Sequence, residues 1–353
     1  MNRWWLSVCP LLWIVGCQFA SPTATPTGSS DGHEAVFARY RHYLAVTAAP
    51  NGTVYAVGHN GTIARRHSDD QSWTLLAPGM EHSLFGVSFP TAQEGWAVGA
   101  AGVILHTADG GATWTPQTSG TDKELLAVHF LDSMYGWAVG AAGVMLETRD
   151  GGQSWHDRSL RADVNLNDLF FLDAQTGWVV GEYGAVLRTT DGGAAWEQIA
   201  GNIPDTGAAD LSWEELMSNP DIGAGGGSMA THGGLGENDT LFAVYFADAR
   251  RGWATATGGR VFLTRDGGAF WEARETGMET ALFAIGAACP TCPLYACGGK
   301  GVVLRSTDGG ETWTAVQTPD RVYAYLRDMT FLGAAEPLLV GTNGTLVVLR
   351  SAG

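Results

Sequence analysis

The feature of this 353-residue sequence that most limits its fold is an eight-residue motif that recurs at a nearly fixed spacing. The copies have the form Ser/Thr-x-Asp-Gly-Gly-x-x-Trp and occur at residues 107–114, 148–155, 189–196, 264–271 and 306–313. Counted from Trp73, which follows a less regular turn, the motif tryptophans are separated by 41, 41, 41, 75 and 42 residues. A period of this length is typical of propellers and other repeat folds, and the step of 75 is one period plus an insertion.

Each repeat contains short apolar segments separated by glycine-rich turns, and residues 125–155 illustrate the pattern. Strands are predicted at 125–130, 136–140 and 143–148, and a fourth strand carrying Trp155 follows the Asp-Gly-Gly turn. The segments are apolar on both faces, which indicates a small sheet packed between two neighbouring sheets. Four such strands per repeat predict the blade of a β-propeller.

The number of blades can be counted from the second strand of each repeat. The residue taken to mark that strand is aromatic in five repeats and leucine in two: Tyr55, Trp96, Trp137, Trp178, Trp253, Leu294 and Leu338. We therefore predict an all-β fold for residues 35–353, a seven-bladed β-propeller of four-stranded blades. The seventh repeat ends at 346–350 without a fourth strand. We expect residues 35–39 to supply it, so that the ring is closed by the N-terminal strand.

The repeated motif has a complete structural explanation. Its aspartate can accept backbone N–H bonds within a tight turn, its glycine allows positive φ, and its tryptophan can pack beneath the turn. Each turn holds one carboxylate, and the turns belong to different blades, so they cannot converge on one substrate or metal ion. We assign this structural role to Asp109, Gly111, Trp114, Asp150, Gly152, Trp155, Asp191, Gly193, Trp196, Asp266, Gly268, Trp271, Asp308, Gly310 and Trp313.

The motif is the Asp-box, or BNR repeat, and each copy follows a Gly-Trp-Ala-Val-Gly type of strand. This combination resembles the photosystem II stability and assembly factor family, and the resemblance covers nearly all of residues 36–353. It implies a seven-bladed propeller that binds assembly intermediates and has no catalytic activity. Photosynthetic members are similar in having an arginine-rich patch for their partner. Here the turns between second and third strands, such as 59–61, 182–184 and 342–344, contain no arginine.

The first residues predict export. Residues 4–15 form an apolar segment that is too short to span a bilayer, and Ile14-Val-Gly-Cys17 resembles a bacterial lipobox. We expect a signal peptide at 1–16, lipid attachment at Cys17, and a Ser/Thr/Pro linker at 17–34. This would place the protein in the periplasm or at the outer membrane, in contact with the membrane only through the lipid anchor. An ordinary signal peptide with an incidental cysteine is the alternative.

Charge and cysteine content limit the partners and cofactors. The net charge of −16 argues against nucleic acid, which needs clustered Lys and Arg, but it is compatible with a cationic protein partner. Cys289 and Cys292 predict a local disulfide, which leaves Cys297 as an odd thiol. No spacing predicts a metal ion or cofactor, so we expect neither, and we expect a monomer.

An interaction surface is expected on the face opposite the Asp-box turns, where second-to-third and fourth-to-first connections emerge together. The acidic, glycine-rich insertion at 201–239 lies in the connection between blades four and five, with a short helix predicted near 210–217. A family-specific loop without a partner is the alternative. The candidate partner-face residues are His59, Glu182, Tyr183, Trp213, Glu214, Glu215 and Lys300.

A glycoside hydrolase or sialidase-like enzyme is the second hypothesis, because such enzymes also carry Asp-boxes. Suitable residue types occur near the predicted closing strand, at Glu34, Arg39, Tyr40, Arg41 and Tyr43. They cluster in sequence, whereas a sialidase site draws its groups from several blades. Two facing carboxylates for ordinary glycoside hydrolysis cannot be recognised from the sequence. The sequence favours a non-catalytic scaffold.

Overall fold

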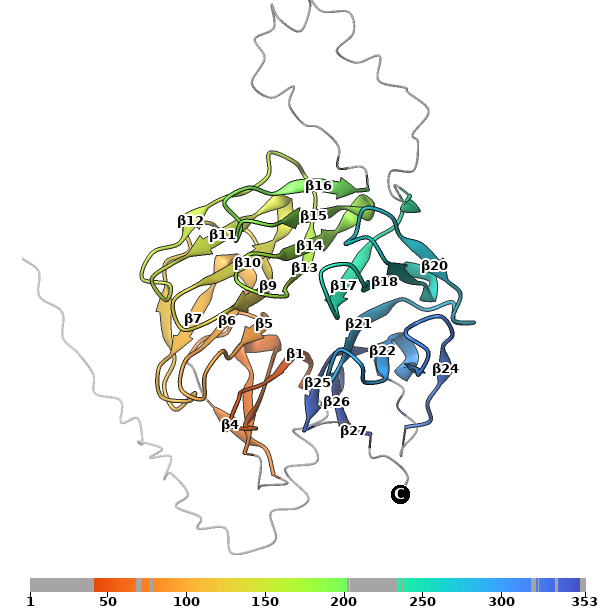
Figure 1. Cartoon of the computed structure of the whole chain (residues 1–353). Coiled ribbons are helices and arrows are strands. Elements are labelled where there is room, and N and C mark those ends of the chain that lie inside the picture. Colours follow the sequence, from red (N-terminus) through yellow and green to blue (C-terminus); the bar gives the residue numbers. More distant parts are fainter. Residues whose placement is uncertain are drawn as a thin grey trace, which may run out of the picture.

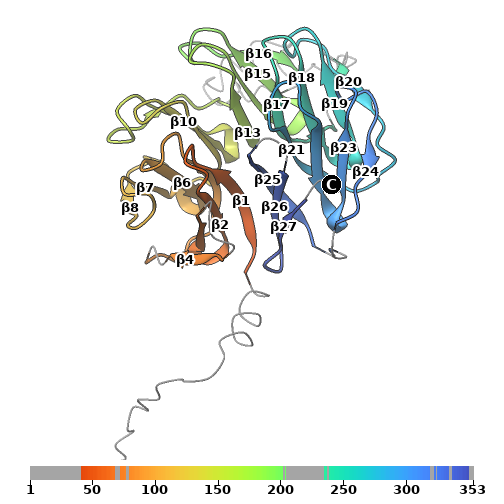
Figure 2. The same cartoon turned by 60° about the horizontal axis from the view of Figure 1, so that its bottom comes forward.

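Seven small antiparallel sheets surround a common axis, as Figure 1 shows along that axis and Figure 2 shows in an oblique view. The computed structural model describes residues 41–67, 72–76, 79–201, 203, 234–236, 238–318, 322, 324–333 and 336–349. We number the sheets as blades 1 to 7 in chain order. The predicted seven-bladed all-β propeller is confirmed.

The strands follow one another from the axis outwards in every blade. Blade 1 contains β1 (Tyr43–Ala48), β2 (Val54–Gly58), β3 (Ile63–Arg66) and β4 (Thr74–Leu76). Blade 2 contains β5 (Leu84–Ser88), β6 (Gly95–Gly99), β7 (Ile104–Thr107) and β8 (Thr115–Gln117). Blade 3 contains β9 (Leu125–Phe130), β10 (Gly136–Gly140), β11 (Met145–Thr148) and β12 (His156–Asp157). Blade 4 contains β13 (Leu166–Phe171), β14 (Gly177–Gly181), β15 (Val186–Thr189) and β16 (Glu197–Ala200).

The remaining three blades keep this order. Blade 5 contains β17 (Leu241–Phe246), β18 (Gly252–Ala256), β19 (Val261–Thr264) and β20 (Glu272–Arg274). Blade 6 contains β21 (Leu282–Ala287), β22 (Leu294–Gly298), β23 (Val303–Ser306) and β24 (Thr314–Ala315). Blade 7 contains β25 (Leu326–Leu332), β26 (Glu336–Gly341) and β27 (Leu346–Val348).

The strand registers correct one assignment made from the sequence. Trp137 pairs with His129 and Glu147 in blade 3, and in blade 6 the equivalent pairs are those of Tyr295 with Gly286 and Arg305. Tyr295, and not Leu294, is therefore the counterpart of the second-strand tryptophans. The error arose because Leu294 replaces the glycine that precedes the tryptophan in blades 2 to 5.

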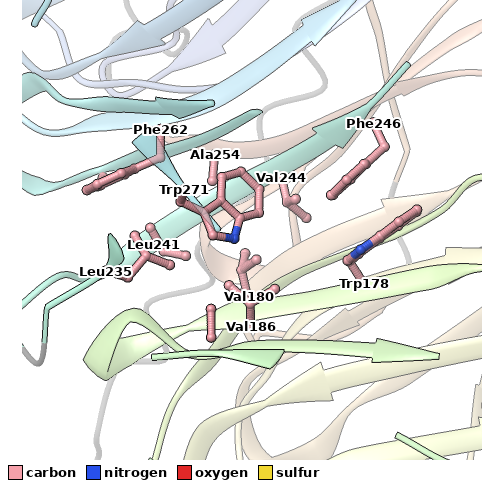
Figure 3. Packing of buried hydrophobic residues seen from close by; sticks show 12 residues of the cluster. Trp178, Val180, Val186, Leu235, Leu241, Val244, Phe246, Ala254, Phe262 and Trp271 are labelled. Atoms are coloured by element: carbon pink, nitrogen blue, oxygen red, sulfur yellow. The ribbon is translucent and has the colours of Figure 1, made fainter. Parts of the chain in front are cut away.

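The hydrophobic core lies between the blades. All five residues of β10 are buried, as are those of β14, because the second strand of each blade is covered on both faces. At the junction of blades 4 and 5, Trp178 stacks on Phe246 with ring centroids 3.6 Å apart, and Trp271 packs edge-on to Phe246 (Figure 3). Each junction therefore buries apolar side chains from two blades, which holds neighbouring sheets together without a single central core.

The second and third strands of six blades are joined by three-residue turns. These turns are η1 (His59–Gly61), η2 (Ala100–Gly102), η3 (Ala141–Gly143), η4 (Glu182–Gly184), η7 (Thr257–Gly259) and η8 (Gly299–Gly301). Their glycines lie against fourth-to-first connections: a Cβ on Gly61 would be 2.3 Å from the carbonyl oxygen of Met80, and one on Gly102 would be 2.0 Å from that of Thr121. Both kinds of connection therefore share one face, which we call the η face, opposite the Asp-box turns.

The expected N-terminal closing strand at 35–39 lies outside the described residues, so ring closure by that strand stays a prediction. Blades 7 and 1 nevertheless pack together, because Leu338 and Val340 share a buried cluster with Tyr43 and Val54. Among the described residues, none of the helices has the length and apolar character needed to cross a membrane.

Closure by residues 35–39 can be tested by truncation. Removing residues 1–34 should leave the thermal midpoint unchanged. Removing residues 1–39 should lower it by several degrees, because β27 would lose its expected strand partner. Thermal unfolding followed by circular dichroism would measure both variants. Equal midpoints would show that residues 35–39 are not the closing strand.

Candidate functional site

The five Asp-box turns share one internal hydrogen-bond pattern. In blade 3 the hydroxyl of Thr148 donates to Asp150 at 2.9 Å, and it accepts the amide N–H of Gly152 at 2.8 Å. Asp150 also accepts the amide N–H of Ser154 at 2.9 Å and its hydroxyl at 2.5 Å. These donors hold the pKa of Asp150 at about 2, well below its usual value of 3.8. The Asp150 carboxylate thus accepts its hydrogen bonds from donors within its own turn.

The other four turns repeat the contacts of the aspartate with the residue two positions before it and with the amide four positions after it. The corresponding aspartates are Asp109, Asp191, Asp266 and Asp308. Side-chain and backbone donors of Thr113 lower the pKa of Asp109 to about 2, and those of Thr312 lower that of Asp308 further. A carboxylate held ionised by several donors is a poor general acid at neutral pH, which supports the structural interpretation.

The Asp-box turns also bind the preceding blade, which the sequence did not reveal. In every turn the carbonyl of the first glycine accepts a hydrogen bond from a side chain of the blade before it. The donors are Tyr55 and Arg65 to Gly110, Gln117 to Gly151, Tyr135 to Gly192, Trp178 to Gly267 and Trp253 to Gly309. Each turn therefore couples two neighbouring blades in addition to reversing the chain.

The motif tryptophans lie at the same junctions. Trp155 packs edge-on to Phe130 of its own blade, and its indole N–H donates to Gln117 of blade 2 at 3.2 Å. Trp271 and Trp313 belong to the buried clusters shared with the preceding blade, and the partly buried Trp114 and Trp196 pack against such clusters. Trp73 packs in the same way in the cluster shared by blades 7 and 1. The predicted packing near the turn is thus part of the contact between two blades.

A cavity of about 640 Å³ lies on the axis toward the η face. The second residue of each innermost strand forms a ring around it, composed of Leu44, Phe85, Leu126, Asn167, Phe242, Phe283 and Arg327. Five of these seven side chains are apolar and all five are half-buried. The cavity therefore offers an apolar ring with two polar positions, the usual composition of a binding pocket.

The rim of the cavity carries charged and aromatic side chains. Arg327 is exposed and its guanidinium lies 4.4 Å from the ring centroid of Phe283. Tyr325 is 54% exposed and also packs against Phe283, with ring centroids 6.3 Å apart. His59 of η1 and Glu124, which precedes β9, complete the rim. An apolar group with a neighbouring anion would find both a ring of apolar contacts and a cation here.

Aromatic side chains follow the cavity toward the Asp-box face. His129 packs against Phe170 and Phe171, with centroids 6.3 and 5.9 Å apart, and Phe170 packs edge-on to Tyr245. Burial lowers the pKa of His129 to about 4, so its imidazole is neutral at pH 7. His129 is thus a packed residue of a blade junction.

Four of the predicted partner-face residues lie in the η turns. Tyr183 and Lys300 occupy the central positions of η4 and η8 with φ of 58° and 56°, a left-handed conformation that is uncommon for such residues. Glu182 accepts from the backbone and side-chain amides of Asn165 at 2.9 and 3.1 Å. His59 lies at the rim of the cavity. Trp213, Glu214 and Glu215 lie outside the described residues.

The end of the acidic insertion is attached to the propeller. Leu235 is buried in the core between blades 4 and 5 (Figure 3), and Asp239 is buried and paired with Arg260. The carbonyl of Asp239 also accepts the amide N–H of Gly184 in η4. Asp239, the last residue of the insertion, therefore uses its carboxylate within the fold.

The predicted disulfide is confirmed between Cys289 and Cys292, and Cys297 is a buried free thiol. Cys17, the predicted lipid attachment site, lies outside the described residues. No group of three or more His, Cys, Asp or Glu side chains in the described part of the chain is placed to hold a metal ion. Of the residues considered for an enzyme, Tyr43 is 3% exposed and packs against blade 7, whereas Glu34, Arg39 and Tyr40 lie outside the described residues.

Comparisons with known proteins agree with this architecture. The profile described as photosynthesis system II assembly factor YCF48 matches residues 65–124 and 115–209, and that of the BNR/Asp-box repeat matches 304–315. The chain is 38% identical over 53 residues to the chloroplastic photosystem II stability/assembly factor HCF136 of Oryza sativa subsp. japonica. That match spans 15% of this chain and 13% of the relative.

Two solved structures resemble nearly the whole chain. YCF48 bound to D1 peptide has a TM-score of 0.66 and 19% identity, covering 89% of this chain and 93% of the other. YCF48 from Cyanidioschyzon merolae has a TM-score of 0.66 and 17% identity, covering 89% and 97%. A WD40 propeller, that of Doa1, reaches a TM-score of 0.64 at 10% identity, so structural similarity at this level identifies the fold.

The fold and its repeated turns define a seven-bladed Asp-box β-propeller with an axial cavity open toward the η face. The profile match over residues 65–209 shows that this part of the chain is similar to the photosystem II stability/assembly factors.

The structural role of Asp150 can be tested by Asp150→Ala, which should lower the thermal midpoint at pH 7. The lowered pKa of Asp150 means that its stabilising effect is complete above the ordinary value near 3.8 and is lost as pH falls to about 2. The difference between wild type and variant should therefore shrink over this range in acid titrations followed by tryptophan fluorescence. A difference that does not depend on pH would contradict the role of the ionised carboxylate.

Close approach of the blades can be tested at Gly193. A Cβ there would lie 2.2 Å from Trp137, at φ of +84°, so Gly193→Ala should destabilise the protein by about 2–4 kcal/mol in urea unfolding. Gly120 has φ of +79° but no atom within 4 Å of an added Cβ. Gly120→Ala is therefore the control for backbone strain alone, expected to cost about 1 kcal/mol. Equal losses in both variants would exclude a steric role for the Trp137 contact.

Proposed function

We propose that this protein is a non-catalytic binding scaffold that holds a segment of a partner protein on the η face, over the axial cavity. The observation that carries the proposal is the ring of half-buried apolar side chains with Arg327 at its rim. Exposed aromatic and apolar groups around a concave site are typical of interaction surfaces on soluble proteins.

The chemistry of the rim indicates which segment would bind. Phe242 and Phe283 face each other edge-on with centroids 5.2 Å apart, and with Phe85 they offer a surface for one or two apolar side chains. The guanidinium of Arg327 has no carboxylate partner among the described residues, although it lies over Phe283. A carboxylate of the bound segment, from a side chain or a chain end, would supply that partner.

The family resemblance supports a protein partner. A propeller of the same fold is described as bound to D1 peptide, and by this analogy the present chain would bind a segment of a photosystem II subunit during assembly. Assembly scaffolds act by holding a partner, which agrees with the absence of shared chemistry among the Asp-box carboxylates. The role in photosynthesis and the lack of catalysis both rest on this analogy.

Export belongs to the same proposal. A signal peptide at 1–16 and a lipid on Cys17 would place the propeller on an envelope membrane, tethered by residues 17–34. The acidic residues of the 201–239 insertion, including Glu214 and Glu215, would then favour cationic partner surfaces beside the cavity. Metabolic labelling with palmitate of wild type and Cys17→Ser would test the lipid directly.

The alternative is a glycoside hydrolase or sialidase-like enzyme, since other Asp-box propellers catalyse such reactions. Asp168 and Asp328 are two carboxyl groups that line the axial cavity, which is the observation that keeps this alternative open. Turnover of a panel of glycosides and sialosides by purified protein, abolished by Asp168→Asn, would favour the enzyme.

Binding at the rim can be tested with a synthetic D1 peptide and purified protein. Arg327→Ala should weaken the dissociation constant about tenfold or more, because a charge-assisted contact would be lost. Arg265→Ala in the Asp-box turn of blade 5 is the matched control and should bind like wild type. Fluorescence anisotropy would measure all three proteins. Binding that is lost in the control but kept in Arg327→Ala would place the partner on the other face.

A further inference from the structure

The seven blade junctions differ in how the chain connects them. Most neighbouring blades are joined by a short connection, such as residues 118–124 between β8 and β9 or 275–281 between β20 and β21. Residues 201–240 separate β16 of blade 4 from β17 of blade 5. Blades 7 and 1 contain opposite ends of the described chain. The junctions 4/5 and 7/1 are therefore the two at which no short connection holds the innermost strands together.

These two junctions also differ in sequence from the other five. The second and third residues of the innermost strands are an apolar residue followed by alanine or glycine at the five short-connected junctions: Leu44-Ala45, Phe85-Gly86, Leu126-Ala127, Phe242-Ala243 and Phe283-Ala284. At junction 4/5 the pair is Asn167-Asp168, and at junction 7/1 it is Arg327-Asp328. The two junctions without the apolar pair are thus the same two that lack a short connection.

Both aspartates bind the innermost strand of the next blade. Asp168 on β13 accepts the amide N–H of Val244 on β17 at 2.9 Å, and Asp328 on β25 accepts that of Val46 on β1 at 2.7 Å. The second carboxyl oxygen of each accepts the amide of the following residue, at 2.8 Å from Leu169 and 2.7 Å from Met329. Alanine or glycine at the other junctions has no side-chain acceptor to offer.

Asn167 strengthens the first of these contacts. Its side-chain amide donates to the carbonyl of Leu241 at 2.7 Å, so β13 and β17 are joined by two side-chain hydrogen bonds. Figure 3 shows the apolar part of the same junction, where Val244 and Leu241 pack in the cluster with Trp178. The polar contacts lie at the cavity end of that apolar contact.

We propose that Asp168 and Asp328 are junction residues that hold the two long-connected blade pairs together through side-chain hydrogen bonds to the next innermost strand, and that ionisation of their carboxyl groups loosens these two junctions. The two side chains are equivalent in place and in contacts, and both line the axial cavity. Loosening of these junctions would widen the ring at two places on opposite sides of the cavity.

The ionisable surroundings of the two carboxyl groups set the direction of this effect. Burial raises the pKa of both to about 7, while the backbone donors and, for Asp328, the charge of Arg327 oppose the rise. Asp328 also raises the pKa of Asp168. The other ionisable groups around them are His59 and Glu124 on the rim, His129 and Tyr245 on neighbouring innermost strands, Tyr43 on β1, and the thiol of Cys297 on β22.

A carboxyl group with a raised pKa stabilises the fold fully below its unfolded pKa near 4 and loses that effect as pH rises through about 7. The two junctions should therefore be tightest at mildly acidic pH and loosest above neutrality. Hydrogen-bond acceptance from the two amides continues in both states, so the ionised form remains folded.

The first test compares Asp168→Ala and Asp328→Ala with wild type, each variant restoring the residue found at the short-connected junctions. At pH 5 the thermal midpoints of both variants should lie several degrees below that of wild type. At pH 8 this difference in thermal midpoint should be smaller. Asp122→Ala, at an exposed aspartate of the β8–β9 connection, controls for the change in net charge and should show a constant, small difference. Variants as stable as wild type at pH 5, or a gap that does not change with pH, would overturn the proposal.

The second test shows which strands are loosened when each aspartate is replaced, and it does not depend on global stability. Hydrogen exchange measured by mass spectrometry should become at least severalfold faster in 241–246 for Asp168→Ala and in 43–48 for Asp328→Ala, with the other innermost strands unchanged. Asp168→Asn and Asp328→Asn keep the side-chain size and cannot ionise, so exchange in these segments should no longer vary between pH 5 and 8. Uniformly faster exchange, or unchanged exchange at the named strands, would contradict the assignment.

Discussion

The propeller depends on a hydrogen bond between a side chain of one blade and a backbone carbonyl of the next. The carbonyl belongs to the first glycine of the Asp-box turn, and the donor is an indole, phenol, amide or guanidinium group on the preceding blade. Donors that are buried at a junction lose water, so they destabilise the fold unless they find a protein acceptor. The Asp-box supplies that acceptor at a fixed place in each repeat, because its internal hydrogen bonds leave the glycine carbonyl free to point outward from the turn.

The donors vary while the acceptor stays constant. In blades 4 and 5 the second-strand tryptophan itself donates, through Trp178 and Trp253. In blade 2 the side-chain amide of Gln117 donates to the equivalent carbonyl, that of Gly151. The indole N–H of Trp96, the second-strand tryptophan of that blade, has no partner among the described residues. A repeat protein can tolerate such exchange because the geometry of each junction is set by the backbone of the turn and by the stacked aromatic rings around it.

The sequence predicted the structural features that recur in every repeat, but it could not predict the features that individual residues add at single positions. Fixed spacing and Gly-Trp strands were enough for the blade count, the four-stranded blades and the role of the Asp-boxes. The position of Tyr295 was misassigned because its repeat lacks the usual glycine. The axial ring could not be recognised, because Phe85, Phe242 and Phe283 have the same apolar character as core positions. Asp168 and Asp328 interrupt the apolar pattern of their repeats, but the sequence could not show their role, since the strands that they bind are distant in sequence.

The seven turns of the η face have a left-handed residue at the centre, and its identity varies around the ring. The positions are Asn60, Ala101, Ala142, Tyr183, Gly258, Lys300 and Asn343, with φ between 52° and 68°. Asparagine and glycine adopt this conformation readily, whereas alanine, tyrosine and lysine do so at a cost of about 1 kcal/mol. Since the backbone is the same in each turn, the side chain can change without moving its neighbours. The ring thus presents seven variable surface positions on one constant backbone. Recognition of a new partner could be evolved or engineered by changing one of these side chains at a time.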